Sequence, residues 1–103
     1  MIPDLNELIT KNKIVIFSKP GCKFCKLAAS LLEEEGLSYY YCELGEYMDD
    51  DDFDDFYQQL VNSTGAKKFP IIYVDGSYIG EYKELKVLMP KLTVAELSVD
   101  DDF

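Results

Sequence analysis

Apolar and polar residues form blocks along the first half of the chain that predict alternating helices and strands. A short helix is expected over residues 4–10, and the β-branched run at 14–17 predicts a buried strand. Apolar residues then recur at helical spacing over residues 24–32, and Gly36 is expected to end that helix. Residues 39–42 predict a second strand.

The second half of the chain predicts a helix, a hairpin and a last helix. The expected elements are a helix over residues 53–61, strands over 71–74 and 77–79, and a helix over 81–89. Asp75-Gly76 is a sequence typical of a two-residue hairpin turn. Pro90 is expected to bend or end the last helix.

These elements predict an α/β fold in one domain. The first strand, helix and strand form a unit that should be right-handed with parallel strands, and the later pair is an antiparallel hairpin. The result is a four-stranded mixed sheet with helices on both faces. We expect this domain to span residues 1–92 and an acidic C-terminal tail to span residues 93–103.

The charge balance excludes several classes of function. Among 103 residues there are 20 acidic and 10 basic side chains, a net charge of -10, and no His. A chain of this kind should repel nucleic acid and anionic membranes, and it has no His-based catalytic triad or His metal ligand. No apolar run is long enough for a membrane span and the N-terminus is unlike a secretory signal, so a cytoplasmic location is expected. A monomer is expected as well.

Three cysteines carry the candidate chemistry: Cys22, Cys25 and Cys42. An odd number argues against a fully paired secreted scaffold, and a structural zinc site usually needs four ligands. A Cys-x-x-Cys pair in an intracellular chain favours redox chemistry and no metal site. A metal half-site or two unrelated cysteines are the alternatives. Cys42 is interpreted as a core residue, the alternative being a regulatory or glutathionylated thiol.

Cys22 and Cys25 lie between the first predicted strand and the helix that follows it, at the start of that helix. The first N–H groups of a helix have no backbone partner and its dipole is positive there, which favours a thiolate at Cys22. Lys19, Lys23 and Lys26 add positive charge. We therefore expect Cys22 to be the nucleophile and the more buried Cys25 to be the resolving thiol.

Three motifs in order resemble the glutaredoxin family over about residues 10–90. They are the segment 14–25 ending Ser-Lys-Pro-Gly-Cys-Lys-Phe-Cys, Thr64-Gly65 followed by Lys68-Phe69-Pro70, and the segment 78–85. The resemblance implies a thioredoxin-like fold with strand order 2-1-3-4. It also implies glutathione-dependent reduction of protein disulfides or glutathione mixed disulfides, with glutathione as co-substrate and no bound cofactor. The Phe69–Pro70 bond should be cis.

The resemblance carries roles over to particular positions. Lys19 and Lys67 would meet glutathione carboxylates, and the backbone of Phe69 would pair with its cysteinyl part. The implied glutathione-binding set is Lys19, Phe24, Lys67, Phe69, Pro70, Tyr82 and Lys83.

Several positions depart from the family pattern. Lys23 replaces a Pro, Phe24 a Tyr and Phe69 a Val, and Gly80-Glu81 replaces a Gly-Gly pair. Lys83 replaces the acid that meets the α-amino group of glutathione, and an ammonium cannot accept that hydrogen bond. Three alternatives follow: Glu81 or Glu84 takes this role, glutathione binds weakly, or a different thiol is the reductant.

Two other functions and one partner are kept open by the sequence. Glutaredoxins without Pro in the dithiol loop include carriers of a glutathione-ligated [2Fe-2S] cluster, although Cys25 argues against this alternative. A thioredoxin-like interaction module without turnover is the other. The acidic end of the chain, residues 97–103, resembles the docking peptide of ribonucleotide reductase small subunits, which makes that enzyme a candidate client.

Overall fold

The computed structural model describes residues 4–44, 50–66 and 68–98. Its elements are α1 (Leu5–Lys11), β1 (Ile14–Ser18), α2 (Lys23–Glu34), β2 (Tyr40–Glu43), α3 (Asp50–Thr64), β3 (Ile71–Val74), β4 (Ser77–Gly80) and α4 (Tyr82–Ser98). Every helix and strand that the hydrophobic pattern predicted is present among these residues, with ends shifted by at most three positions except at the end of α4. No helix in the described ranges is both long and apolar enough to span a bilayer.

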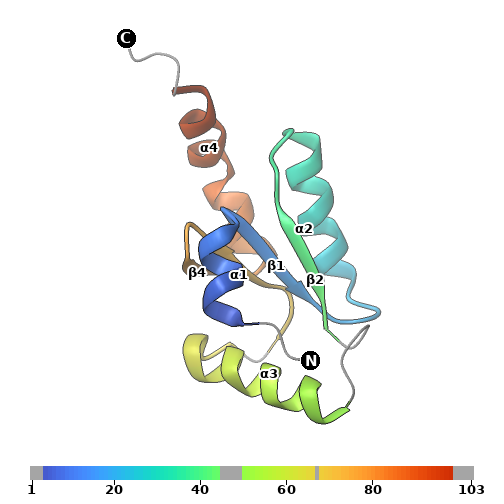
Figure 1. Ribbon diagram of the computed structural model, residues 1–103. Coiled ribbons are helices and arrows are strands. Elements are labelled where there is room, and N and C mark those ends of the chain that lie inside the picture. Colours follow the sequence, from blue (N-terminus) through green and yellow to red (C-terminus); the bar gives the residue numbers. More distant parts are fainter. Residues whose placement is uncertain (1–3, 45–49, 67, 99–103) are drawn as a thin grey trace.

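The four strands form one mixed sheet in the order β2-β1-β3-β4, as predicted (Figure 1). Strand β1 pairs in parallel with β2 and antiparallel with β3, and β4 pairs antiparallel with β3. Strand β1 is therefore a central strand, paired along both edges, and all five of its residues are buried.

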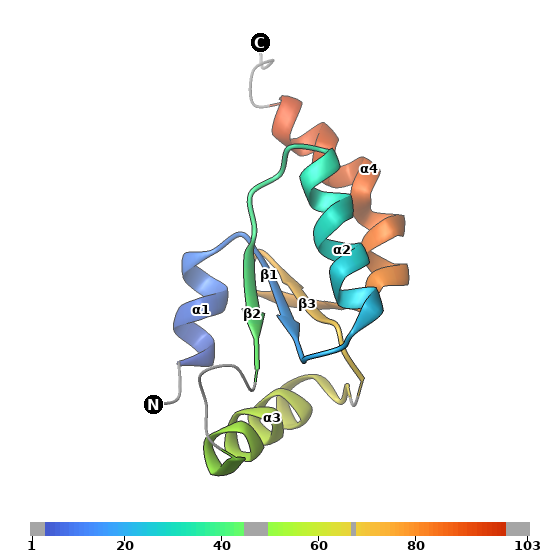
Figure 2. The same cartoon turned by 90° about the vertical axis from the view of Figure 1, so that its right-hand side faces the viewer.

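Helices cover both faces of this sheet (Figure 2). Side chains alternate along β1, so Val15 and Phe17 join one core cluster while Ile14 and Ile16 join the other. The first cluster packs against α1 and α3, and the second packs against α2 and α4. The sheet thus holds the end of β1, where the dithiol loop begins, between two apolar layers.

The hairpin between β3 and β4 has the expected two-residue turn. Asp75 and Gly76 both have positive φ, at 53° and 81°. This is the type I′ geometry, whose twist matches that of the flanking strands.

Helix α4 is longer than its sequence pattern indicated. It continues through Pro90 to Ser98, so of the two outcomes expected for Pro90, a bend or an end of the helix, the end is wrong. Pro90 has no N–H to donate to the backbone carbonyl four residues earlier. It lies on the exposed side of the helix, where water can hydrate that carbonyl instead. Beyond it, Leu92 is buried in the α2–α4 cluster and holds the next turn. The helix runs across the expected domain boundary at residue 92, and residues 99–103 lie outside the described residues.

Tyr39 links the start of β2 to the end of α2, and this contact predicts a pH dependence of stability. Its hydroxyl donates a hydrogen bond to the Glu33 carboxylate. This bond, with burial as a smaller cause, raises the pKa of Tyr39 to about 12. Between pH 10 and 12 the folded chain keeps a proton that the unfolded chain loses, so the contribution of Tyr39 is complete below pH 10 and declines above it.

The measurement is urea unfolding of the wild type and of Tyr39→Phe at several pH values. We expect the unfolding free energy of the wild type, relative to that of Tyr39→Phe, to decrease as pH rises from 10 to 12. Tyr73 and Tyr78 also have raised pKa values, mainly through burial, but they are common to both chains. A difference that is constant over this range would contradict the prediction.

Candidate redox site

The candidate site begins where β1 leaves the sheet. The loop Lys19-Pro20-Gly21 follows, with Gly21 at a φ of 78° that favours glycine. The Cys22 N–H closes the loop by donating to the Lys19 carbonyl at 3.3 Å. Cys22 is the N-cap of α2, and its Sγ accepts a hydrogen bond from the Cys25 N–H at 3.2 Å. The reactive sulfur is thereby placed at the positive end of a helix.

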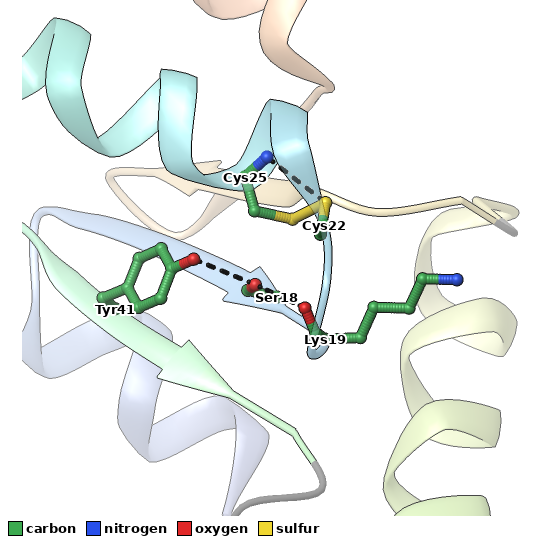
Figure 3. Close-up of a disulfide and its surroundings, with 5 residues drawn as sticks. All are labelled: Ser18, Lys19, Cys22, Cys25 and Tyr41. Carbon is green, nitrogen blue, oxygen red and sulfur yellow. Dashed lines mark hydrogen bonds between the residues drawn. A yellow bond between two sulfur atoms is a disulfide. The ribbon is translucent and has the colours of Figure 1, made fainter.

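Cys22 and Cys25 form a disulfide in this structure (Figure 3). Their Cα atoms are 5.3 Å apart, within the usual range for a bonded pair. Cys22 is partly exposed, whereas Cys25 is completely buried. A partly exposed sulfur suits the attacking thiol, and a buried sulfur suits the resolving thiol. Cys42 is buried in the core, in agreement with its interpretation as a core residue.

Positive charge surrounds the exposed sulfur. A hollow of about 280 Å³ opens beside it and is lined by Gly21, Cys22, Lys23 and Lys26. Lys19, in the preceding loop, is also exposed, and the first turn of α2 holds no acid. The site therefore favours anionic substrates although the chain as a whole is acidic.

A second hollow of about 280 Å³ brings together three residues of the predicted glutathione-binding set. It is lined by Phe24, Glu81, Tyr82 and Lys83, from the starts of α2 and α4. The rings of Phe24 and Tyr82 lie 5.9 Å apart, and Phe24 is 55% exposed. An exposed aromatic side chain beside a reactive sulfur is suited to contact with a substrate.

The two acids near this hollow have different surroundings. Glu84 Oε1 accepts a hydrogen bond from the Glu81 N–H at 2.8 Å, and this bond is the main cause that lowers the pKa of Glu84. Gly80 allows the approach, since a Cβ there would lie 2.6 Å from Glu84 Cγ. Glu84 thus caps the start of α4, and Glu81 is the acid that lines the hollow. Of the two acids weighed from the sequence, the structure favours Glu81 for contact with an ammonium group.

Lys19 and Phe69 are brought together on the other side of the dithiol loop. The Lys19 Nζ lies 5.9 Å from the centre of the Phe69 ring, at cation–π distance. The Phe69–Pro70 bond is cis, as predicted, and Pro70 is fully buried. Lys67, the remaining predicted residue, lies outside the described residues.

Tyr57 and Tyr41 lie near the site although the sequence did not predict them there. Tyr57 of α3 stacks on Phe69, with ring centres 5.8 Å apart, and was read only as part of an apolar helix face. Tyr41 of β2 donates a hydrogen bond to Ser18 below the dithiol loop, and was read only as part of a strand. The local sequence predicted a helix around Tyr57 and a strand around Tyr41, and no local signal showed which side chain each would contact.

Comparison with known proteins gives one consistent result. The glutaredoxin family model matches residues 14–79. Human mitochondrial glutaredoxin-2 is 33% identical over 79 residues, which cover 77% of this chain and 46% of that protein. A glutaredoxin from Vernicia fordii is 31% identical over 74 residues, covering 72% of this chain and 68% of the relative. The chain spans about half the length of the mitochondrial relatives.

Solved structures show the same fold. The holo form of glutaredoxin C1 from Populus tremula x tremuloides superposes with a TM-score of 0.76 at 27% identity, covering 93% of this chain and 92% of that one. A buckwheat glutaredoxin–glutathione complex gives a TM-score of 0.76 at 23% identity, covering 92% and 84% of the two chains.

Proposed function

We propose, since this chain belongs to the glutaredoxin family, that it is a glutathione-dependent thiol–disulfide oxidoreductase. The observation that carries the proposal is the Cys22–Cys25 disulfide at the start of α2, with one sulfur accessible and the other buried. The exposed lysines beside Cys22 suit an anionic thiol such as glutathione.

The proposed reaction is a series of thiol–disulfide exchanges. The reduced Cys22 thiolate attacks one sulfur of a client disulfide, forming a Cys22–client bond and releasing the other client sulfur as a thiolate that takes a proton from water. The Cys25 thiolate then attacks the Cys22 sulfur, which releases the second client thiolate and forms the Cys22–Cys25 disulfide. Two glutathione molecules supply the two electrons that restore the dithiol, and they leave as glutathione disulfide.

A glutathione mixed disulfide follows a shorter route. The Cys22 thiolate attacks the glutathione sulfur and releases the client thiolate. A second glutathione thiolate attacks the glutathionylated Cys22, which regenerates the Cys22 thiolate and gives glutathione disulfide. Cys25 takes no part in this route.

Residues around Cys22 have roles in holding glutathione under this proposal. Lys19 would bind a carboxylate of glutathione, and the hollow of Phe24, Glu81, Tyr82 and Lys83 would receive the end of the tripeptide that carries the α-amino group. The buckwheat protein that shares this fold was solved with glutathione, which supports the choice of tripeptide.

The test of the proposal is turnover of a glutathionylated peptide with glutathione, followed through glutathione reductase and NADPH. Turnover that saturates with glutathione is the expected result. A chain that yields no turnover, while its dithiol still oxidises and reduces, would overturn glutathione as the reductant and direct attention to thioredoxin reductase.

Lys83 provides a prediction on affinity. Its ammonium repels the α-amino group of glutathione, so Lys83→Glu should lower the KM for glutathione by about two- to fivefold, the range expected for an exposed ion pair. Steady-state kinetics at several salt concentrations measure the effect, which should shrink as salt rises. Lys91→Glu makes the same charge change further along α4 and is the matched control. Equal effects of the two variants would contradict a specific role for Lys83.

The physiological context stays a prediction from the sequence. Ribonucleotide reductase as client rests on the tail resemblance, and residues 99–103 of that tail lie outside the described residues. The [2Fe-2S] alternative, a monomeric state and a cytoplasmic location also stay predictions, and relatives include proteins named mitochondrial and chloroplastic.

A further inference from the structure

We propose that Tyr41 and Ser18 are positioning residues for Cys22, acting through a chain of hydrogen bonds beneath the dithiol loop. The inference rests on the proposed function, because it assigns these residues to the reactivity of the same sulfur.

The chain starts at a buried hydroxyl. Ser18 is 0% exposed, so its hydroxyl is a buried polar group that needs hydrogen-bond partners. The Tyr41 hydroxyl donates to Ser18 Oγ at 3.0 Å, and Ser18 Oγ donates to the Lys19 carbonyl at 3.2 Å (Figure 3). A serine hydroxyl has one proton, so its donation to the carbonyl requires Tyr41 to be the donor in the first bond.

The Lys19 carbonyl connects this pair to the reactive sulfur. It also accepts the Cys22 N–H at 3.3 Å, and Cys22 Sγ in turn accepts the Cys25 N–H at 3.2 Å. The position of one carbonyl therefore affects where the Cys22 backbone sits relative to the first N–H groups of α2. A displaced carbonyl would move the sulfur away from the donors that favour its thiolate.

The loop needs such an anchor because its own residues restrain it weakly. Pro20 has no N–H to donate, and a Cβ built on Gly21 meets nothing within 4 Å. On the sheet side, by contrast, the Ser18 carbonyl accepts the Leu44 N–H at 2.7 Å, so β1 and β2 are joined at this level. The hydrogen bonds of Tyr41 and Ser18 connect the loop to this firmly paired part of the sheet.

The two hydroxyls differ in the expected size of their effect. Ser18→Ala removes the bond to the Lys19 carbonyl directly, so the alkylation rate of Cys22 at neutral pH should fall by about two- to tenfold. Tyr41→Phe leaves that bond in place but takes away the partner that orients the Ser18 hydroxyl, and its effect should be smaller. The double variant should be no slower than Ser18→Ala alone, since both changes act through one bond.

The experiment is the pH profile of iodoacetamide reaction at Cys22 in the reduced full chain, quantified by mass spectrometry. We expect the apparent pKa of Cys22 to move upward in Ser18→Ala and by less in Tyr41→Phe. Tyr40→Phe removes a neighbouring hydroxyl of β2, for which the structure records no bond to the loop, and should leave the profile unchanged. The charged side chains of the dithiol loop and of the two hollows beside it are unchanged in all variants, namely Lys19, Lys23, Lys26, Glu81 and Lys83, and so is Glu43, which lies in register with Ser18.

A purely structural role would give a different result. If both variants lower the melting temperature but retain the wild-type pH profile of alkylation, the proposal is overturned. If Ser18→Ala fails to fold, the pH profile of Tyr41→Phe alone decides between the two roles. Alkylation uses no glutathione. Loss of glutathione turnover in the wild type would therefore overturn the proposed function and leave the positioning result standing.

Discussion

Replacing Cys22 with serine should abolish glutathione-dependent turnover, with a loss of at least about 10³-fold in kcat/KM. The hydroxyl of serine is far less acidic than a thiol, so the helix N-terminus and the lysines cannot make it a nucleophile at neutral pH. Cys22 carries the partly exposed sulfur, and its partner is completely buried, so the chain offers no substitute at this position.

Cys25→Ser should separate the two routes of the proposed reaction. It should keep turnover of a glutathionylated peptide, because a second glutathione can release Cys22, and lose most turnover of a protein disulfide, which requires the resolving thiol. Both activities are measured with the same coupled assay on the two substrates.

Cys42→Ala is the control for these variants, since it removes the buried thiol that lies in the core. It should keep both activities. Turnover that survives Cys22→Ser, or is lost equally in Cys22→Ser and Cys25→Ser on the glutathionylated peptide, would contradict the assignment of Cys22 as nucleophile.

Phe17→Ala should destabilise the chain by about 3–5 kcal/mol, the usual cost of removing a large aromatic side chain from a core. Phe17 is fully buried at the centre of the sheet, and its ring lies 5.5 Å from that of Phe56 and 5.9 Å from that of Tyr73. A domain of this size has about 5–15 kcal/mol of stability in total, so the variant should be near the limit of folding.

Urea unfolding at 25 °C measures the loss. Val87→Ala is a suitable control, because Val87 is an apolar residue 76% exposed on α4 and should change stability by less than about 0.5 kcal/mol. A similar loss of unfolding free energy in Phe17→Ala and Val87→Ala would show that Phe17 does not stabilise the α3 side of the core.

The amino-acid pattern was sufficient for the elements, for a four-stranded mixed sheet and for the place of the dithiol, whereas the strand order was an implication of the family resemblance. The run at 14–17 and the helical spacing at 24–32 are local signals, and each is set by which neighbouring side chains must be buried together. The same locality explains the position of Cys22, because a Cys-x-x-Cys pair between a strand and a helix lies at the helix N-terminus whatever the remaining chain does. The cis Phe69–Pro70 bond and the binding set came from resemblance and not from such signals.

Contacts between distant segments were not available from the pattern. Tyr41 meets Ser18 across 23 positions of sequence, and Tyr57 of α3 meets Phe69 only after the sheet and helices have packed. The division of roles between Glu81 and Glu84 depends on one backbone N–H at the start of α4. The continuation of α4 through Pro90 depends on Leu92 reaching the core. Periodicity states which face of an element is buried, whereas the partner of each side chain follows from the register and packing of whole elements, which no local stretch of sequence contains.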